Sequence, residues 1–187
     1  MAPRISAQIV ERHVVRGETV EAGAPLVTLS SVEMAGAQGA LIISDQEWRR
    51  VRSLGRDVVS EKRYVEAEVA SQQAQATLLS YGMAEREVAK LLKSGDASKA
   101  TGQFVLFSPQ DGTIVRDDFT IGEFVDAGAL LIEISDESTV WVEARLTSEQ
   151  AGQISVGAPA RVKSNAGHWE KGRVAQLQHA LDETTRT

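Results

Sequence analysis

The side chains that most often perform catalysis or bind metal ions are sparse in this sequence. The three histidines, His13, His168 and His179, lie far apart and lack the spacing of a zinc site or a catalytic triad. Cysteine is absent, which excludes a disulfide scaffold, thiolate metal ligands and a catalytic thiol. We therefore expect the histidines to be surface residues and the chain not to be an enzyme.

Two methionines and two acidic pairs are the other candidate ligands. Met34 and Met83 could offer soft thioether sulfur to Cu(I), but Met34 falls within an apolar helical pattern that favours core packing. Two acidic pairs are expected to be solvated charges of a turn and a helix face: Asp117-Asp118 and Glu85/Glu87. The sequence therefore predicts no catalytic residue, no metal site and no cofactor.

Arginine is the one chemically distinctive residue type that clusters. Arg49, Arg50, Arg52 and Arg56 lie in one short stretch, with Leu54 among them. A guanidinium presents a planar fork of donors that suits backbone carbonyls or carboxylates, and an exposed leucine beside it could fill an apolar notch. This pattern is typical of a protein-docking site, although arginines can also simply solvate a loop.

A long-range repeat indicates which elements present this cluster. Residues 17–26 return as residues 122–131 without a gap, at a constant offset of 105 positions (122 minus 17). Four glycines of the repeat should occupy turns that need a positive φ: Gly17, Gly23, Gly122 and Gly128. Alternating apolar residues around them predict short strands. Each copy is too small to bury its apolar face alone, so the two copies should pack face to face as one β-sandwich.

The repeat also divides the chain. Residues 1–30 and 103–135 should form the two sandwich halves, with residues 31–102 inserted between them. Apolar spacings of three, four and seven predict two antiparallel helices of about 20 residues, roughly 30 Å long, and a short third helix over 84–93. The expected contact seam of the hairpin is Met34, Ala37, Leu41, Ser44, Trp48 and Val51 on the first helix and Val65, Val69, Gln72, Ala76 and Leu79 on the second. The arginine cluster then lies at the hairpin tip, around the break at 55–57.

Residues 136–187 show a different pattern. Alternating residues predict short strands at 139–146, 158–162 and 172–177, with one helical turn at 147–151. Three strands are too few for an independent sheet. We therefore expect an incomplete β-domain after an α+β body.

Composition restricts the functional classes further. The 187-residue chain is 42% hydrophobic and 25% charged, which is ordinary for a globular protein. Its net charge of -6 argues against nucleic acid as a partner. It contains no apolar run long enough to span a membrane, and no signal peptide follows Met1. The chain is therefore expected to be either cytosolic or cut from a longer precursor.

The order of these regions resembles the periplasmic adaptor subunits of bacterial tripartite efflux pumps, also called membrane fusion proteins or the HlyD-like family. Five stretches carry the resemblance in family order: 2–6, 17–26, 108–115, 136–142 and 181–187. The short hairpin and the Thr139-Val140-Trp141-Val142 stretch resemble the heavy-metal branch, which serves resistance-nodulation-division (RND) pumps.

This resemblance implies a split lipoyl-like sandwich with an inserted α-helical hairpin, followed by a partial β-barrel domain that continues beyond Thr187. It implies a location in the periplasm, attached to the inner membrane through a signal or anchor outside this sequence. The implied partners are an inner-membrane RND transporter, an outer-membrane TolC-like channel and further copies of the chain in a ring, a hexamer in the assembled pump. The exported substrates would be heavy-metal cations or drugs.

The hairpin tip resembles the family in detail. Arg50, Leu54 and Ser60 are similar to the arginine–leucine–serine pattern with which many adaptors contact their exit channel. The spacing to Ser60 is about one residue shorter than in that pattern, and the neighbouring arginines compete for the role of Arg50. The resemblance therefore implies a docking site at these three residues.

Two alternatives share parts of this architecture. A lipoyl or biotinyl carrier domain has the same sandwich, but its modified lysine would stand where this chain has Glu33. A carboxylate cannot form the amide that attaches the cofactor, and the helices of residues 31–102 replace what should be a tight turn. The other alternative is an adaptor for an ABC or type I exporter.

Overall fold

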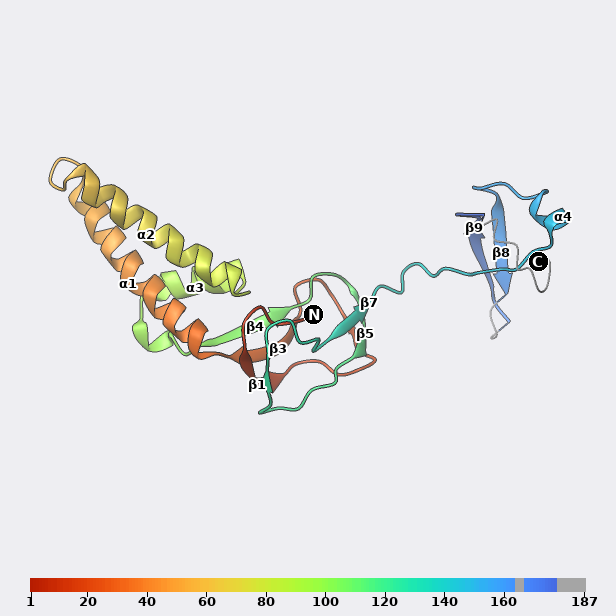
Figure 1. Ribbon diagram of the computed structural model, residues 1–187, viewed down its shortest axis with the longest axis horizontal. Coiled ribbons are helices and arrows are strands. Elements are labelled where there is room, and N and C mark those ends of the chain that lie inside the picture. Colours follow the sequence, from red (N-terminus) through yellow and green to blue (C-terminus); the bar gives the residue numbers. More distant parts are fainter. Residues whose placement is uncertain (164–166, 178–187) are drawn as a thin grey trace. The chain divides into compact units, whose positions relative to one another are not determined.

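The computed structural model describes residues 1–163 and 167–177 (Figure 1). The chain forms two compact units, Met1–Thr139 and Val140–Thr187. The larger unit combines two β-sheets with a helical hairpin, and the smaller contains a two-stranded ribbon. The larger unit confirms the predicted α+β fold, with a split sandwich into which a helical hairpin is inserted.

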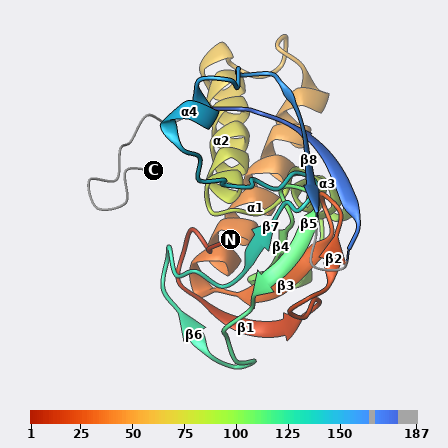
Figure 2. The same ribbon diagram turned by 90° about the vertical axis from the view of Figure 1, so that its right-hand side faces the viewer.

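Seven short strands form the two sheets of the sandwich. The first sheet has the order β4-β3-β1-β6 and the second β2-β5-β7, with antiparallel neighbours throughout. Their bounds are β1 (Ala7–Arg12), β2 (Thr19–Val20), β3 (Pro25–Ser30), β4 (Gln103–Phe107), β5 (Gly112–Arg116), β6 (Phe124–Val125) and β7 (Glu133–Ser135). Figure 2 shows β6 at the edge of the first sheet. Ile9, Leu29, Phe104, Ile114 and Ile132 are almost fully buried in the core.

The two copies of the repeat exchange hydrogen bonds at equivalent positions. Gly17 N–H donates to Ile114 O and Gly122 N–H donates to Ile9 O, both at 2.8 Å. Likewise β6 pairs with β1, and β2 pairs with β5. The prediction of two copies packed face to face is therefore wrong in one respect, because each sheet contains strands from both copies. The two-residue strands β2 and β6 follow turns at Gly17 and Gly122, with φ of 89° and 90°. After these turns, each strand pairs with a strand of the other copy.

Three helices form the insertion. Helices α1 (Val32–Leu54) and α2 (Glu61–Ser80) run side by side away from the sheets, with α3 (Glu85–Ser94) at their base, followed by a 3₁₀ turn, η1 (Ala97–Lys99) (Figure 1). Helix α1 ends where Gly55 adopts a φ of 80°. Helix α2 begins at a serine cap, in which the Ser60 hydroxyl accepts a hydrogen bond from Arg63 N–H at 3.4 Å. The predicted helix break and restart are confirmed.

The contact seam was predicted correctly for α1, whereas on α2 only Leu79 of the five predicted residues is partly buried. Met34, Leu41 and Val51 are buried as expected. On α2, however, Val65 and Val69 are 43% and 51% exposed, and Gln72 and Ala76 are also exposed. The residues that face α1 are instead Tyr64, Ala67, Ser71, Ala74 and Leu78. Small side chains dominate this face because α1 contributes bulky ones, and close helix packing needs large residues opposite small ones.

The hairpin root, defined as Ser31, Gln38, Gly102 and Gln103, joins the helices to the sandwich. The Gln38 amide is 2% exposed; its Nε2 donates to Gln103 O (3.0 Å), and its Oε1 accepts from Gly102 N–H (2.9 Å). Gly102 has a φ of 77°, and a Cβ there would lie 2.4 Å from Ser31 O. The helix bases and the sheets share one hydrophobic cluster. The hairpin is therefore fixed to the sandwich by packing and by a satisfied polar contact.

The smaller unit contains the antiparallel strands β8 (Pro159–Lys163) and β9 (Trp169–Arg173) and the short helix α4 (Ser148–Ala151). The strand expected at 158–162 and the helical turn expected at 147–151 are thus confirmed. The strand expected at 172–177 is displaced towards the N-terminus, and residues 139–146 are not a strand, because they have no pairing partner within the described part of the chain. His179 and the stretch 181–187 lie outside the described residues. Across 1–163 and 167–177, no helix combines the length and apolarity that crossing a membrane requires.

Candidate docking site at the hairpin tip

The hairpin tip, residues 47–67, has a small core of its own. Val51, Val59 and Ala67 are buried together, and Trp48 packs edge-on against Tyr64 with ring centroids 5.0 Å apart. Val59 N–H donates to Gly55 O at 3.2 Å, which closes the loop. The tip is therefore an ordered platform that is separate from the main hydrophobic cluster.

The three residues predicted to contact the channel differ in the contacts that they already make within the chain. Arg50 and Leu54 are exposed one turn apart at the end of α1, and Arg50 forms an ion pair with Glu47. Ser60 is also exposed, but its hydroxyl already accepts the hydrogen bond that caps α2. The geometry thus leaves Arg50 and Leu54 available for a partner and gives Ser60 a structural role at the start of α2.

The competing arginines can be separated by their contacts. Arg49 turns towards α3, where its Nη2 donates to Leu92 O at 2.8 Å. Arg56 stacks on the Tyr64 ring, with Cζ 4.6 Å from the ring centroid. Arg52 is exposed and has no ion pair within the described residues. Arg52 is therefore the closest rival to Arg50 as a docking cation.

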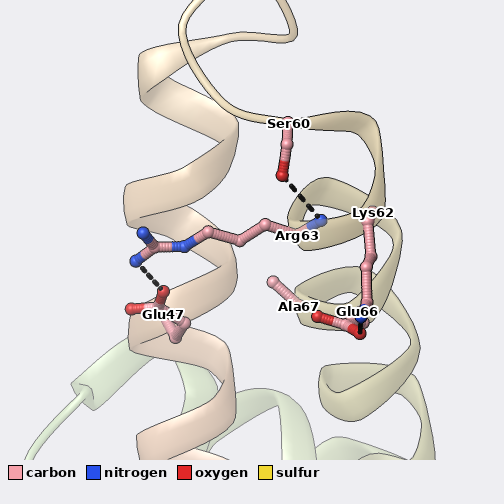
Figure 3. Close-up of a pocket in the computed structure, with 6 residues that line it drawn as sticks. All are labelled: Glu47, Ser60, Lys62, Arg63, Glu66 and Ala67. Atoms are coloured by element: carbon pink, nitrogen blue, oxygen red, sulfur yellow. Dashed lines mark hydrogen bonds and ion pairs between the residues drawn. The ribbon is translucent and has the colours of Figure 1, made fainter.

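Sequence reasoning missed Arg63, which crosses from α2 to α1. Its Nη2 lies 2.9 Å from Glu47 Oε1, as Figure 3 shows. The Arg63 hydrogen bond, followed by that of Arg50, holds the pKa of the Glu47 carboxyl below its ordinary value. One carboxylate thus orients arginines from both helices. The pairing could not be read from the sequence because it depends on the rotation of α2, which was predicted incorrectly.

A groove lies between the helices beside this bridge (Figure 3). It has a volume of about 540 Å³ and is lined by Glu47, Ser60, Lys62, Arg63, Glu66 and Ala67. Four of its six lining residues carry a charge and it is open to solvent, whereas small-molecule sites are concave and bury most of their ligand. The groove therefore suits contact with another protein better than capture of a small ligand.

The remaining candidate ligands belong to the structural framework. Met34 and Met83 are buried in the main cluster, as the packing interpretation predicts. His13 Nε2 lies 2.7 Å from Thr28 Oγ1, and His168 is exposed. Among the residues that the structure describes, no three histidine or carboxylate side chains gather in a way that could hold a metal ion.

Two carboxylates were wrongly expected to be solvated. Asp117 is only 14% exposed and lies 2.6 Å from Arg12 Nη1, which also stacks on Phe119. Glu87 is partly buried beneath β4, and its Oε2 accepts a long hydrogen bond of 3.5 Å from Val105 N–H. Burial raises the pKa of Glu87, and its backbone hydrogen bonds only partly offset that effect. Both side chains lie where the chain folds back on itself, which local sequence context does not reveal.

Comparisons with known proteins agree with this architecture. The sequence profile of the CzcB-like barrel-sandwich hybrid domain matches residues 1–136, and that of the CusB-like β-barrel domain matches residues 139–187. The chain is 26% identical over 196 aligned residues to the cobalt-zinc-cadmium resistance protein CzcB of Cupriavidus metallidurans, covering all of this chain and 37% of CzcB. It is 27% identical over 165 residues to the nickel and cobalt resistance protein CnrB of the same organism, covering 84% of this chain and 40% of CnrB.

One solved structure also supports the fold. A MacA–MexA chimeric protein that contains the Pseudomonas aeruginosa MexA α-hairpin domain superimposes with a TM-score of 0.56 at 16% identity. The match covers 96% of this chain and 63% of the chimera. The chain thus spans well under half the length of the curated relatives it matches.

Proposed function

The chain belongs to the CzcB-like barrel-sandwich hybrid family, and from this premise we propose that it is part of a non-enzymatic periplasmic adaptor of a tripartite efflux pump. It would join an inner-membrane RND transporter to an outer-membrane TolC-like channel, with the full protein attached to the inner membrane. The observation that carries the proposal is the root of the hairpin, where a buried amide and a shared core fix two long helices to the sandwich. A rigid arm with a polar tip suits bridging between two other proteins.

The outer-membrane channel would contact the hairpin tip. Arg50 supplies a donor fork whose orientation is set by Glu47, and Leu54 supplies an exposed apolar group one turn away. Backbone carbonyls or carboxylates on the channel would pair with the arginine. Ser60 contributes by capping α2 and so holding the loop in shape.

The test is efflux by the full-length protein in a host that lacks its own adaptor. Arg50→Glu or Leu54→Asp should abolish growth at raised zinc or cobalt while leaving adaptor abundance unchanged. Lys90→Glu, an equal charge reversal on an exposed residue of α3, should have no effect. Normal resistance in both tip variants at normal abundance would remove the docking proposal.

Self-association into a ring is supported by two outward faces of the hairpin. On α1, Val32 and Ile43 are 90% and 72% exposed, and on α2, Val65 and Val69 are also exposed. Ile43 lies two residues from the buried Leu41, about 200° around the helix, so it points away from α2. On α2, Val65 and Val69 each lie two residues from the buried Ala67, so they point away from α1 for the same reason.

Opposite apolar edges favour contact between α1 of one copy and α2 of the next. Such a head-to-tail contact closes into a ring when the rotation permits, and a hexamer is our proposal for the assembled pump. Ile43→Arg and Val69→Arg should each weaken self-association of the full-length protein in sedimentation measurements. Unchanged sedimentation of both variants, under conditions in which the unmodified protein associates, would exclude this contact.

Divalent metal cations are the substrates we propose for the pump, because the relatives CzcB and CnrB are named for cobalt, zinc, cadmium and nickel resistance. The adaptor itself need not bind them. We further propose that residues 1–30 and 103–135 act as the central body, residues 31–102 as the arm and residues 136–187 as the start of the barrel. Metal tolerance of a strain that lacks the adaptor, tested metal by metal, checks the substrate class.

A further inference from the structure

The ribbon of β8 and β9 carries an unusual charge pattern on one face. Alternation and register place Arg161 and Lys163 of β8 on the same face as Lys171 and Arg173 of β9, with Trp169 at one end. All five side chains are exposed. We call the four cations the cationic face. The opposite face carries Ala160, Val162, Glu170 and Gly172, so the positive charge is confined to one side.

The cationic face is unfavourable for the ribbon taken alone. Arg161 and Lys171 are directly opposite each other in the register, and like charges in that position destabilise a strand pair. None of the four cations has an ion-pair partner within 1–163 and 167–177. Anionic groups bound at this face would relieve the repulsion.

The residues around the cationic face indicate which kind of anionic group could bind there. A hollow of about 610 Å³ lies against the ribbon and is lined by Arg161, Lys171 and Arg173 of the cationic face together with Pro159, Ala160 and Gly172. Arg161 Cζ and Lys163 Nζ lie 5.8 Å and 6.0 Å from the centroid of the Trp169 ring. The tryptophan is thus flanked by cations, and the described residues of the ribbon place no aliphatic stripe beside it as a membrane-surface element would need. The guanidinium forks of Arg161 and Arg173, held on paired strands, match the geometry of carboxylates.

We propose that the cationic face is a docking surface for a protein segment that presents carboxylates at alternating positions. Arg161 and Arg173 bind these carboxylates through their guanidinium forks, Lys163 and Lys171 add positive charge, and Trp169 packs on the segment. This surface is separate from the hairpin tip, and its test does not depend on the assembly role proposed above.

The direct test uses a fluorescein-labelled peptide of alternating glutamate and threonine. Fluorescence anisotropy measures its binding to the 187-residue chain. Binding should saturate and weaken steeply as sodium chloride is raised. The double variant Arg161→Glu/Lys171→Glu should bind about tenfold more weakly or worse. Lys90→Glu/Lys93→Glu, the same charge change on exposed residues of α3, should bind as the unmodified chain does.

A second variant distinguishes binding from folding. Lys171→Glu places opposite charges across the ribbon, so it should slow amide exchange in β8 and β9 while weakening peptide binding. Loss of both exchange protection and binding would assign the lysine a structural role and overturn the proposal. The proposal would also fail if phosphatidylglycerol vesicles bound and the peptide did not, or if the peptide bound the double variant as tightly as the control.

Discussion

The root and the tip of one hairpin are held together in different ways. At the root, the buried Gln38 and Gly102 make hydrogen bonds inside a continuous hydrophobic cluster. At the tip, a separate cluster of three buried residues is surrounded by exposed ion pairs such as Arg63–Glu47. The difference indicates that the root determines the direction of the arm, whereas the tip keeps its polar groups accessible to a partner.

The largest effect should come from Gly102→Ala at the root. A methyl group would lie 2.4 Å from the backbone oxygen of Ser31, at a φ that disfavours side chains. We expect a loss of about 4 kcal/mol of unfolding free energy, since neither a backbone atom nor a positive φ can adjust cheaply. Denaturant titration followed by helical circular dichroism measures it. Gly95→Ala, also at positive φ but with open space around its Cβ position, is the matched control, and an equal loss there would show that the close approach is unimportant.

Gln38→Leu should have the next largest effect. It removes the partner of the buried Gly102 N–H and of the partly buried Gln103 O, and a buried group left unsatisfied costs roughly 1–3 kcal/mol. We expect about 3 kcal/mol of destabilisation and faster amide exchange at Gly102. Gln46→Leu removes only an exposed hydrogen bond to Gly95 O and should change stability little. A mild effect at Gln38, equal to that at Gln46, would contradict the root-and-tip distinction.

Protonation of Glu87 should affect the contact between α3 and β4, where its carboxylate accepts a hydrogen bond from Val105 N–H. Burial raises the folded-state pKa of this carboxyl above its ordinary value near 4.5. Its stabilising contribution is therefore complete below the unfolded pKa and is lost as the pH rises through the higher folded pKa. Glu87→Gln should be slightly more stable than the unmodified chain at neutral pH, and the difference should vanish in acid. A stability difference that does not vary with pH would refute this assignment.

The smallest effect should come from Arg63→Ala at the tip. Exposed ion pairs contribute little to stability, and Arg63 and Glu47 are 57% and 32% exposed. We expect a destabilisation much smaller than that of Gln38→Leu, which should disappear at high salt because the charges are screened. Thermal unfolding at low and high sodium chloride measures it. A loss comparable to that of Gln38→Leu would mean that the tip is structurally as important as the root.

More of the fold than of the candidate site could be predicted from the sequence. The constant offset between Gly17 and Gly122 locates both halves of the sandwich, because turns with positive φ leave a clear glycine pattern. It does not reveal that β2 and β6 cross to the opposite copy, since strand pairing is a three-dimensional property. The prediction of the α2 contact seam was wrong because Val65 and Val69 are more hydrophobic than Ala67 and Ser71. Close packing against α1 nevertheless buries the two smaller side chains.

At the tip, the residue types predicted a cluster of arginines, but their positions in the sequence did not predict the contacts of each arginine. The cluster of arginines was evident, but the separate contacts of Arg49, Arg56 and Arg63 follow from helix rotation and the location of α3. Asp117 and Glu87 were misjudged for the same reason, because their neighbours are distant in the sequence. Long-range partners of single charged residues leave no local signal.

The reciprocal hydrogen bonds of the repeat also constrain the order in which the chain can fold. Gly17 N–H finds its acceptor only when Ile114 has emerged, and β1 gains its second neighbour only after Phe124 and Val125. The helical hairpin, whose contacts are local, can form earlier. The first strands therefore stay incompletely paired until residues 124 and 125 are available, and the risk of aggregation is greatest before that point.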